Sequence, residues 1–292
     1  MVGENLPEKI GFTANQQDTY YKYKKLIGET ADKFAKEYML GNMTQKEALE
    51  AFYAEKNENV HKYTADLIFL LECSGYLLEK YKEKGLSEDL FIGAMCDIKY
   101  KLDECINVKD VFGTFVVRWF DGFFKMKRFA IGRLQYDVIS FEEDEEYDGK
   151  LFKKGDLCLS CHIPSAGPLT PHLCIESYRL AYRFFRGRLT NGILPVKCSS
   201  WLLYPSYLPV FGEESNVGKF VKSFKINKVD KHDVFGDAWR IFKMDFDGNA
   251  DKLPVKTTMQ KNFVEYIKNG GDFGLATGIL LFDGENILTA RK

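Results

Sequence analysis

The segment 157–186 constrains the fold more than any other part of the chain, because it reads as a strand, a tight loop and a helix in immediate succession. Apolar and polar side chains alternate from Leu157 to Ile163, which is typical of a strand with two different faces. Pro164 and the Gly-Pro pair behind it predict a tight loop of small residues. Thr170 is a good N-cap and Pro171 a good first residue for a helix ending near position 186.

This strand–loop–helix connection is a candidate anion site. The first turn of a helix presents backbone N–H groups and the positive end of the helix dipole, which suit phosphate. The same geometry is also a common structural connection. On the residues alone, both interpretations stay open.

The hydrophobic pattern divides the chain into two domains, at residues 1–127 and 128–292. The first part has helical periodicity, whereas the second begins with alternation; a chain of 292 residues is long enough for two domains. We expect N-terminal helices over 18–39, from the capping box at 44–47, over 59–84 and over 87–105, and a buried apolar helix over 109–127.

The second part is predicted to be mixed. Expected elements are alternating strand over 128–141, an acidic solvated hairpin tip at 142–149, strand over 194–203, an antiparallel pair of 225–229 with 239–246, a helix over 257–268 and a strand over 275–282. The fold class is therefore α+β, with a helical N-terminal region followed by a mixed sheet flanked by helices.

Composition excludes several classes of protein. The net charge is -1, so no basic excess predicts binding to nucleic acid or to an anionic membrane surface. No apolar run approaches the roughly 18 residues of a membrane span. Met1 to Asn5 lacks the pattern of a signal peptide, and the seven scattered cysteines are expected to be reduced thiols. We therefore expect a cytoplasmic protein.

Cys158, Cys161 and His162 match the C-x-x-C-H pattern of haem attachment. On an alternating strand the two thiols should point to opposite faces, and a zinc site that adds Cys174 meets the same objection. We expect no haem and no metal.

His162 is a candidate general base, since it lies directly before the loop and a neutral imidazole is available near pH 7. The alternative is a structural histidine that fixes the loop. Arg133, Gln135 and Asp137 share a strand face that either meets a polar ligand or is simply exposed. No G-x-S-x-G elbow is present, which disfavours a serine hydrolase.

Five motifs occur in an order that is familiar. They are Arg-Leu-Gln-Tyr at 133–136, His-Ile-Pro at 162–164 with Gly-Pro-Leu at 167–169, Ser-Trp-Leu-Leu at 200–203 followed by Pro205, Ser-Asn at 215–216 with Phe220 and Phe224, and Thr-Thr-Met-Gln at 257–260. The sequence resembles a bacterial acyltransferase-like family with an N-acyltransferase-type N-terminal domain and a GNAT-like C-terminal domain. The resemblance covers about 129–281 well and the helical part more loosely.

The resemblance implies acyl transfer from acyl-CoA or acetyl-CoA to a small-molecule amine. In the GNAT superfamily the donor lies between two splayed parallel strands, here 157–163 and 196–203, and its pyrophosphate meets the loop behind the first of them. By analogy, the loop residues that would hold phosphate are Ser165, Ala166, Gly167, Leu169 and Thr170. The catalytic candidates are His162 as the base and Tyr204 or Tyr207 as the acid for the leaving thiolate. Candidate substrate-binding residues are Arg133, Gln135, Ser200, Trp201 and Asn216.

Two departures from the family pattern keep an alternative open. The position before Ser200 is often histidine in the family and is Ser199 here. The loop lacks the usual R/Q-x-x-G-x-G/A spacing, and Pro168 has no N–H to donate. The alternative is a non-catalytic ligand-binding or interaction module that keeps the fold.

Overall fold

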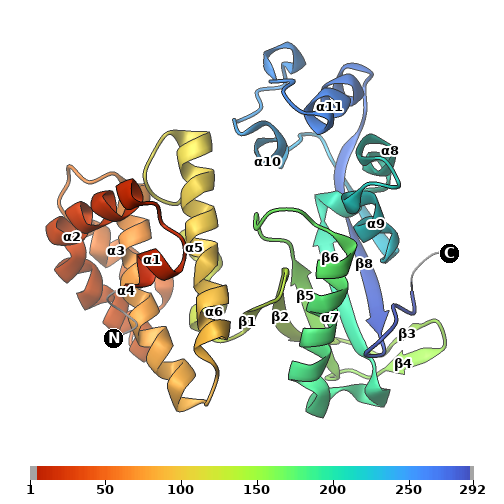
Figure 1. Cartoon of the computed structure of the whole chain (residues 1–292), viewed down its shortest axis with the longest axis horizontal. Helices are drawn as coiled ribbons and strands as arrows, with labels where there is room; N and C mark the ends of the chain where they lie inside the picture. Colours follow the sequence, from red (N-terminus) through yellow and green to blue (C-terminus); the bar gives the residue numbers. More distant parts are fainter. Residues whose placement is uncertain (1–4, 290–292) are drawn as a thin grey trace. The chain divides into compact units, whose positions relative to one another are not determined.

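The computed structural model describes residues 5–289, and the fold is α+β, as predicted (Figure 1). Contacts divide the chain after Ala130 into an N-terminal and a C-terminal unit. The predicted boundary at 127/128 remains a proposal. Met1 to Glu4, part of the segment inspected for a signal peptide, lie outside the described residues. None of the helices within 5–289 combines the length and the apolar character that a membrane-spanning helix needs.

The N-terminal unit is helical. Its elements are α1 (Leu6–Lys9), α2 (Ala14–Leu40), α3 (Gln45–Glu55), α4 (Lys62–Glu83), α5 (Glu88–Lys109), the 3-10 turn η1 (Val117–Phe120) and α6 (Asp121–Phe124). The expected capping box begins α3: Thr44 Oγ1 accepts from Glu47 N, and Glu47 Oε2 accepts from Thr44 N. Gly41, at φ 85, ends α2 in the left-handed conformation.

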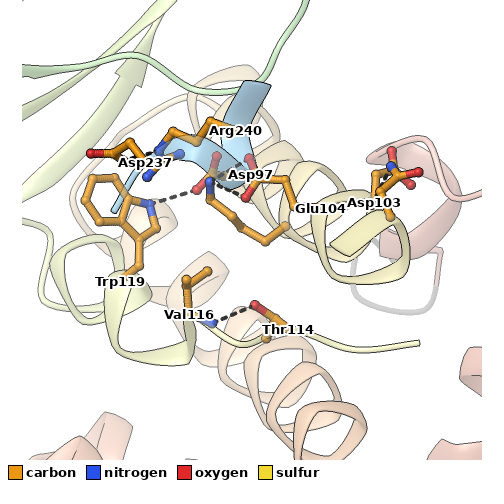
Figure 2. A network of polar contacts seen from close by, with 10 residues as sticks. Asp97, Asp103, Glu104, Thr114, Val116, Trp119, Asp237 and Arg240 are labelled. Carbon is orange, nitrogen blue, oxygen red and sulfur yellow. Dashed lines mark hydrogen bonds and ion pairs between the residues drawn. The ribbon is translucent and has the colours of Figure 1, made fainter. Parts of the chain in front are cut away.

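The predicted long helix over 109–127 is wrong. Asp110 adopts a left-handed φ of 53 and ends α5. Gly113 then packs so tightly on Tyr63 that a Cβ would lie 2.3 Å from the Tyr63 carbonyl, and Thr114 N donates to that same oxygen. Further on, Trp119 Nε1 donates to Asp97 Oδ2 at 2.8 Å, which ties η1 to α5 (Figure 2). Tertiary packing breaks an apolar run that periodicity alone reads as one helix.

The C-terminal unit is built on a mixed sheet. The chain continues from β1 (Arg128–Ile131) through β2 (Leu134–Ser140), β3 (Glu145–Tyr147), β4 (Lys150–Phe152), β5 (Leu157–His162), α7 (Pro171–Phe185), β6 (Leu194–Ser200), α8 (Leu208–Phe211), α9 (Asn216–Lys222), β7 (Lys225–His232), α10 (Ala238–Phe242), α11 (Thr258–Lys268) and β8 (Phe273–Phe282). Short 3-10 turns lie at Arg186–Arg188, Thr190–Gly192, Trp201–Leu203, Pro205–Tyr207 and Ala250–Lys252. In this unit the strand order is β2-β5-β6-β8-β7, and β5–β6 is the parallel pair.

The two faces of this sheet are covered differently. α7 lies along one face (Figure 1), where Tyr136 Oη and Ser177 Oγ are 2.8 Å apart and the rings of Tyr178 and Phe282 meet. The hairpin β3–β4 covers part of the other face, where its Phe152 packs in one cluster with Phe141 and Cys158. The rest of that second face carries polar side chains.

The predicted pairing of 225–229 with 239–246 is wrong. β7 pairs with β8 instead, and the segment after Asp237 forms the short helix α10. Ala238, Ile241 and Phe242 are buried, at positions i, i+3 and i+4, so the same apolar residues satisfy a helical face. The acidic stretch at 142–149 was expected to be the tip of a hairpin. In the structure the turn lies at Asp148–Gly149, whereas Glu145 lies in the strand β3.

Candidate functional site

The parallel strands β5 and β6 are in register over a short distance only. Their paired residues are Leu159 with Val196 and Ser160 with Lys197. β5 nevertheless continues along β2 as far as His162, and β6 continues along β8 as far as Ser200. The carboxyl ends of the two strands therefore separate in the middle of the sheet. The two strands are the pair expected at 157–163 and 196–203, but the second ends at Ser200, because Trp201–Leu203 form a 3-10 turn.

His162 lies at the end of β5, where this separation begins. Its Nε2 is 3.0 Å from Asp137 Oδ2, and the two side chains are 25% and 24% exposed. The register places Gln135 opposite His162 and Asp137 opposite Ser160, so these side chains share one face. In the tautomer that carries its proton on Nε2, this nitrogen donates to the Asp137 carboxylate. The structure thus pairs a partly exposed histidine with a carboxylate, and the expected role of His162 as a base stays a prediction.

The same face continues across the sheet. Ser199 and Thr277 are paired between β6 and β8, and Thr277 Oγ1 donates to Ser199 Oγ at 3.0 Å. The position that is often histidine in the family thus holds a hydroxyl engaged with its neighbour. Nearer the hairpin, Lys197 Nζ contacts Glu145 Oε1 at 2.6 Å and closes the other end of this polar face. Gln135 is buried, at 2% exposed.

Arg133 holds the loop behind β5. Its guanidinium donates to three backbone carbonyls: Nη1 to Pro164 at 3.0 Å, Nη2 to Gly167 at 2.8 Å and Nε to Pro168 at 3.1 Å. The side chain is buried, and Gly167 has the left-handed φ of 90 that such a turn requires. These three bonds tie the loop to the start of β2 through one side chain. The expected substrate contact of Arg133 stays a prediction.

The loop leads to the N-terminus of α7. Thr170 occupies the N-cap position, as expected, but its hydroxyl makes no capping bond, and Oγ1 is a buried atom without a partner among residues 5–289. A buried hydroxyl without a partner is costly, so an external acceptor at this point would be favoured. A Cβ placed on Gly167 would have no neighbouring atom within 4 Å, so the space beside the loop is open.

A groove of about 220 Å³ starts at this helix end and runs between α7 and α9. Pro171, Cys174 and Tyr178 line it from α7, and Phe220 lies opposite. Tyr178 Oη is buried with no partner among the described residues, and burial raises the pKa of this phenol well above its usual range. Lys219 and Lys222 lie on its α9 side, each paired with nearby glutamates. The groove thus joins apolar walls to a rim of lysine–glutamate ion pairs.

Tyr204 and Tyr207 lie in a buried aromatic cluster beyond the end of β6. Tyr204 Oη donates to Asp272 Oδ2 at 2.7 Å, and Tyr207 Oη accepts from Gly274 N at 3.4 Å. Burial, with the bond to Asp272, raises the pKa of Tyr204, and burial raises that of Tyr207. Both phenols are therefore protonated. Their proposed acid role stays a prediction.

The remaining candidates lie around the same end of the sheet. Trp201 packs with Tyr207, Phe211 and Phe263 of the aromatic cluster. Ser200 Oγ accepts from Leu202 N at 3.2 Å and so caps the turn after β6. Asn216 is exposed at the start of α9. Their substrate contacts stay predictions.

The cysteines of β5 point to opposite faces, as alternation predicts. Cys158 packs with Phe141 and with Phe152 of the hairpin, whereas Cys161 adjoins Cys174 and Cys198 under α7. Burial raises the pKa of the Cys161 thiol, which makes it a poor nucleophile. Within 5–289 no group of three or more His, Cys, Asp or Glu side chains has the arrangement of a metal site.

Two functional features escaped the sequence interpretation. Asp137 was noted as polar, yet its pairing with His162 depends on the β2–β5 register, which sequence does not give. The sequence interpretation gave Tyr178 no functional role, although this buried side chain also lines the groove. A tyrosine at a position otherwise suited to phenylalanine was the available signal.

A central pair of parallel strands that separate, with a tight loop and a helix after the first of them, defines a GNAT-like domain. The models of two protein families match the chain: the GNAT-like C-terminal domain at residues 129–280 and the N-acyltransferase N-terminal domain at 6–126. The chain therefore belongs to the acyltransferase-like family that joins these two domains, as the resemblance predicted.

Solved structures share the fold. One is an acyltransferase in complex with decanoyl-CoA and teicoplanin, with a TM-score of 0.72 and 15% identity over 95% of this chain and 86% of that one. Another is an acyltransferase in complex with CoA and 10C-teicoplanin, with a TM-score of 0.63 and 18% identity over 75% of this chain and 66% of that one. No curated protein sequence matches the chain.

Proposed function

We propose that this protein transfers an acyl group from acyl-CoA, or acetyl-CoA, to the amine of a small-molecule acceptor. One observation carries the proposal: the His162–Asp137 pair lies where β5 and β6 separate, directly before the loop held by Arg133. Similar folds that contain CoA, decanoyl-CoA or octanoyl-CoA support a CoA thioester as the donor. The presence of teicoplanin in two of them supports a small-molecule acceptor.

The donor's diphosphate is assigned to the loop and the first turn of α7. Backbone groups of Ser165, Ala166, Gly167 and Leu169, together with the Thr170 hydroxyl, would supply donors to it. Pro168 and Pro171 have no N–H, so the cradle has fewer amide donors than one without prolines. The groove between α7 and α9 would take another part of the donor.

The chemistry uses few groups. His162 Nδ1 accepts a proton as the amine nitrogen forms its bond to the thioester carbon, and Asp137 stabilises the imidazolium. A backbone N–H near the end of β5 would stabilise the developing oxyanion. The C–S bond then breaks, and the thiolate takes a proton, for which Tyr204 or Tyr207 is the proposed source.

Acceptor recognition is assigned to Gln135, Ser200, Trp201 and Asn216, with Arg133 acting through the loop. We further propose a cytoplasmic location, since all seven cysteines are free thiols, as expected in a reducing compartment.

Calorimetric titration of the purified protein with CoA, acetyl-CoA and octanoyl-CoA tests the donor site. Gly167→Asp places a carboxylate in the open space beside the loop, and Gly167→Asn imposes the same backbone demand without charge. We expect micromolar binding to wild type and to Gly167→Asn, and binding at least tenfold weaker for Gly167→Asp.

Equal loss in both Gly167 variants would mean that backbone strain, and not charge, is responsible. Failure of all three ligands to bind the wild type would rule out a CoA donor. Binding without turnover against a panel of amines would favour the non-catalytic module.

A further inference from the structure

A second cavity lies wholly within the N-terminal unit. It has a volume of about 720 Å³ and forms where α2 ends, α3 begins and α4 makes its last turn, with residues 124–127 as the remaining wall. This size lies within the range of about 300–1,000 Å³ typical of small-molecule sites. Nothing in the proposed acyl transfer uses it.

The rim of the cavity is cationic. Lys80, Lys84, Lys125 and Lys127 line it. Lys80 Nζ donates to the Met39 carbonyl at 2.6 Å, and Lys125 pairs with Asp121 at 2.9 Å.

Two of these lysines have side chains that are available to a ligand. Lys84 and Lys127 are exposed, and the ammonium group of neither makes a hydrogen bond or ion pair with any residue from 5 to 289. The acidic residue on the wall is Glu47, whose Oε2 accepts from Thr44 N and Oγ1 at 2.8 Å in the capping box. Two ammonium groups are therefore left to attract an anion.

The walls are apolar and adaptable. Met39, Met43 and Met126 line the cavity, three of the chain's seven methionines, beside the buried ring of Phe124. Leu40 also lines it, although it is 61% exposed. Methionine side chains are flexible and polarizable, so they fit apolar groups of varied shape. A compact polar anion would leave these walls exposed to water.

We propose that this lysine–methionine cavity binds a single-chain anionic amphiphile. A carboxylate head would lie between Lys84 and Lys127, and a flexible alkyl tail would lie against the three methionines. The head satisfies the ammonium groups, and the tail removes apolar surface from water. This site is independent of the acyl-transfer site, because every lining residue belongs to the N-terminal unit.

The test is NMR of the full-length protein labelled with [methyl-¹³C]methionine, titrated with octanoate at low ionic strength. We expect saturable shifts of Met39, Met43 and Met126. Met95, buried in α5, and Met244 and Met259, in the C-terminal unit, are internal controls. Acetate and 1-octanol, which carry the head and the tail alone, should each bind at least fivefold more weakly than octanoate.

Charge reversal locates the head group. Lys84→Glu with Lys127→Glu should weaken octanoate at least tenfold, with 1-octanol unaffected. Lys36→Glu, at an exposed position on α2 outside the cavity, is the matched control and should bind as wild type does. Undisturbed Met95 signals would show that the double variant folds.

Absence of shifts at Met39, Met43 and Met126 would overturn the proposal, and so would shifts confined to Met244 and Met259. Octanoate affinity that survives the double charge reversal would overturn the assigned head-group position. None of these results would bear on CoA binding, which the Gly167 variants test separately.

Discussion

His162 and Asp137 carry the proposed proton transfer, and they can be tested separately. His162→Ala should lower kcat about 100- to 10,000-fold and leave CoA affinity unchanged, because the imidazole acts on the acceptor amine and not on the nucleotide. Steady-state kinetics and calorimetry measure the two quantities. A loss of CoA affinity comparable to the loss of kcat would contradict the assignment.

Asp137→Asn removes the charge that orients and stabilises the histidine. We expect kcat to fall at least tenfold with little change in KM for the donor. Glu146→Gln, at an exposed position on the hairpin, is the control and should retain full activity. An unchanged kcat for Asp137→Asn would remove the carboxylate from the mechanism.

Arg133 is predicted to act as a positioning residue for the phosphate loop. Arg133→Lys keeps the charge but cannot reach three carbonyls at once, since its ammonium is a point donor. CoA affinity should fall about tenfold. Arg179→Lys, at an exposed position on α7, should have no effect. If Arg133 contacts the acceptor instead, the variant should raise the acceptor KM with CoA affinity intact.

The connection between β1 and β2 depends on its packing against α7. Gly132 has a φ of 66, and a Cβ there would lie 3.1 Å from Ser177 Cα. Gly132→Ala should therefore lower the free energy of unfolding by about 1–3 kcal/mol in urea titrations. Gly187→Ala, with no atom within 4 Å and no positive φ, should change it little. Equal effects would remove the packing argument.

Capping residues predicted the start of several helices, because a cap depends only on residues that are close in the sequence. The capping box at Thr257 and Gln260 marks the start of α11, and Ser215 caps α9 through Gly218 N. The predictions were wrong for two segments in which tertiary contacts decide the secondary structure. One is the segment around Gly113, which packs on Tyr63; the other is 238–246, where the buried apolar residues fit both a helical and a strand pattern. In the site, the strand–loop–helix was predictable, whereas the pairing of Asp137 with His162 depends on register.

Stability of the N-terminal unit should depend on pH through Asp66. Burial raises the pKa of this carboxyl to about 6, although the Tyr53 hydroxyl donates to it and lysines lie near. The folded state then holds a proton that the unfolded chain has lost. The free energy of unfolding should fall as pH rises from about 4 to about 6, by on the order of 3 kcal/mol.

Asp66→Asn should remove most of that slope, measured by denaturant titration at several pH values. Glu58→Gln, at an exposed position, should keep it. A wild-type slope that persists in Asp66→Asn would assign the proton to another group.

The sheet of the C-terminal unit has a seam, by which we mean the central line where β5 and β6 are paired only at Leu159–Val196 and Ser160–Lys197. The centre of a sheet is usually where amide hydrogens exchange most slowly with solvent. Here each central strand is bonded along its outer neighbour but to the other strand over little more than Leu159 and Ser160. Amides that face each other beyond this point should exchange early, inside otherwise protected strands. A ligand that inserts along the seam would supply the missing bonds and act as a substitute strand, so its binding would register as slowed exchange at the heart of the sheet.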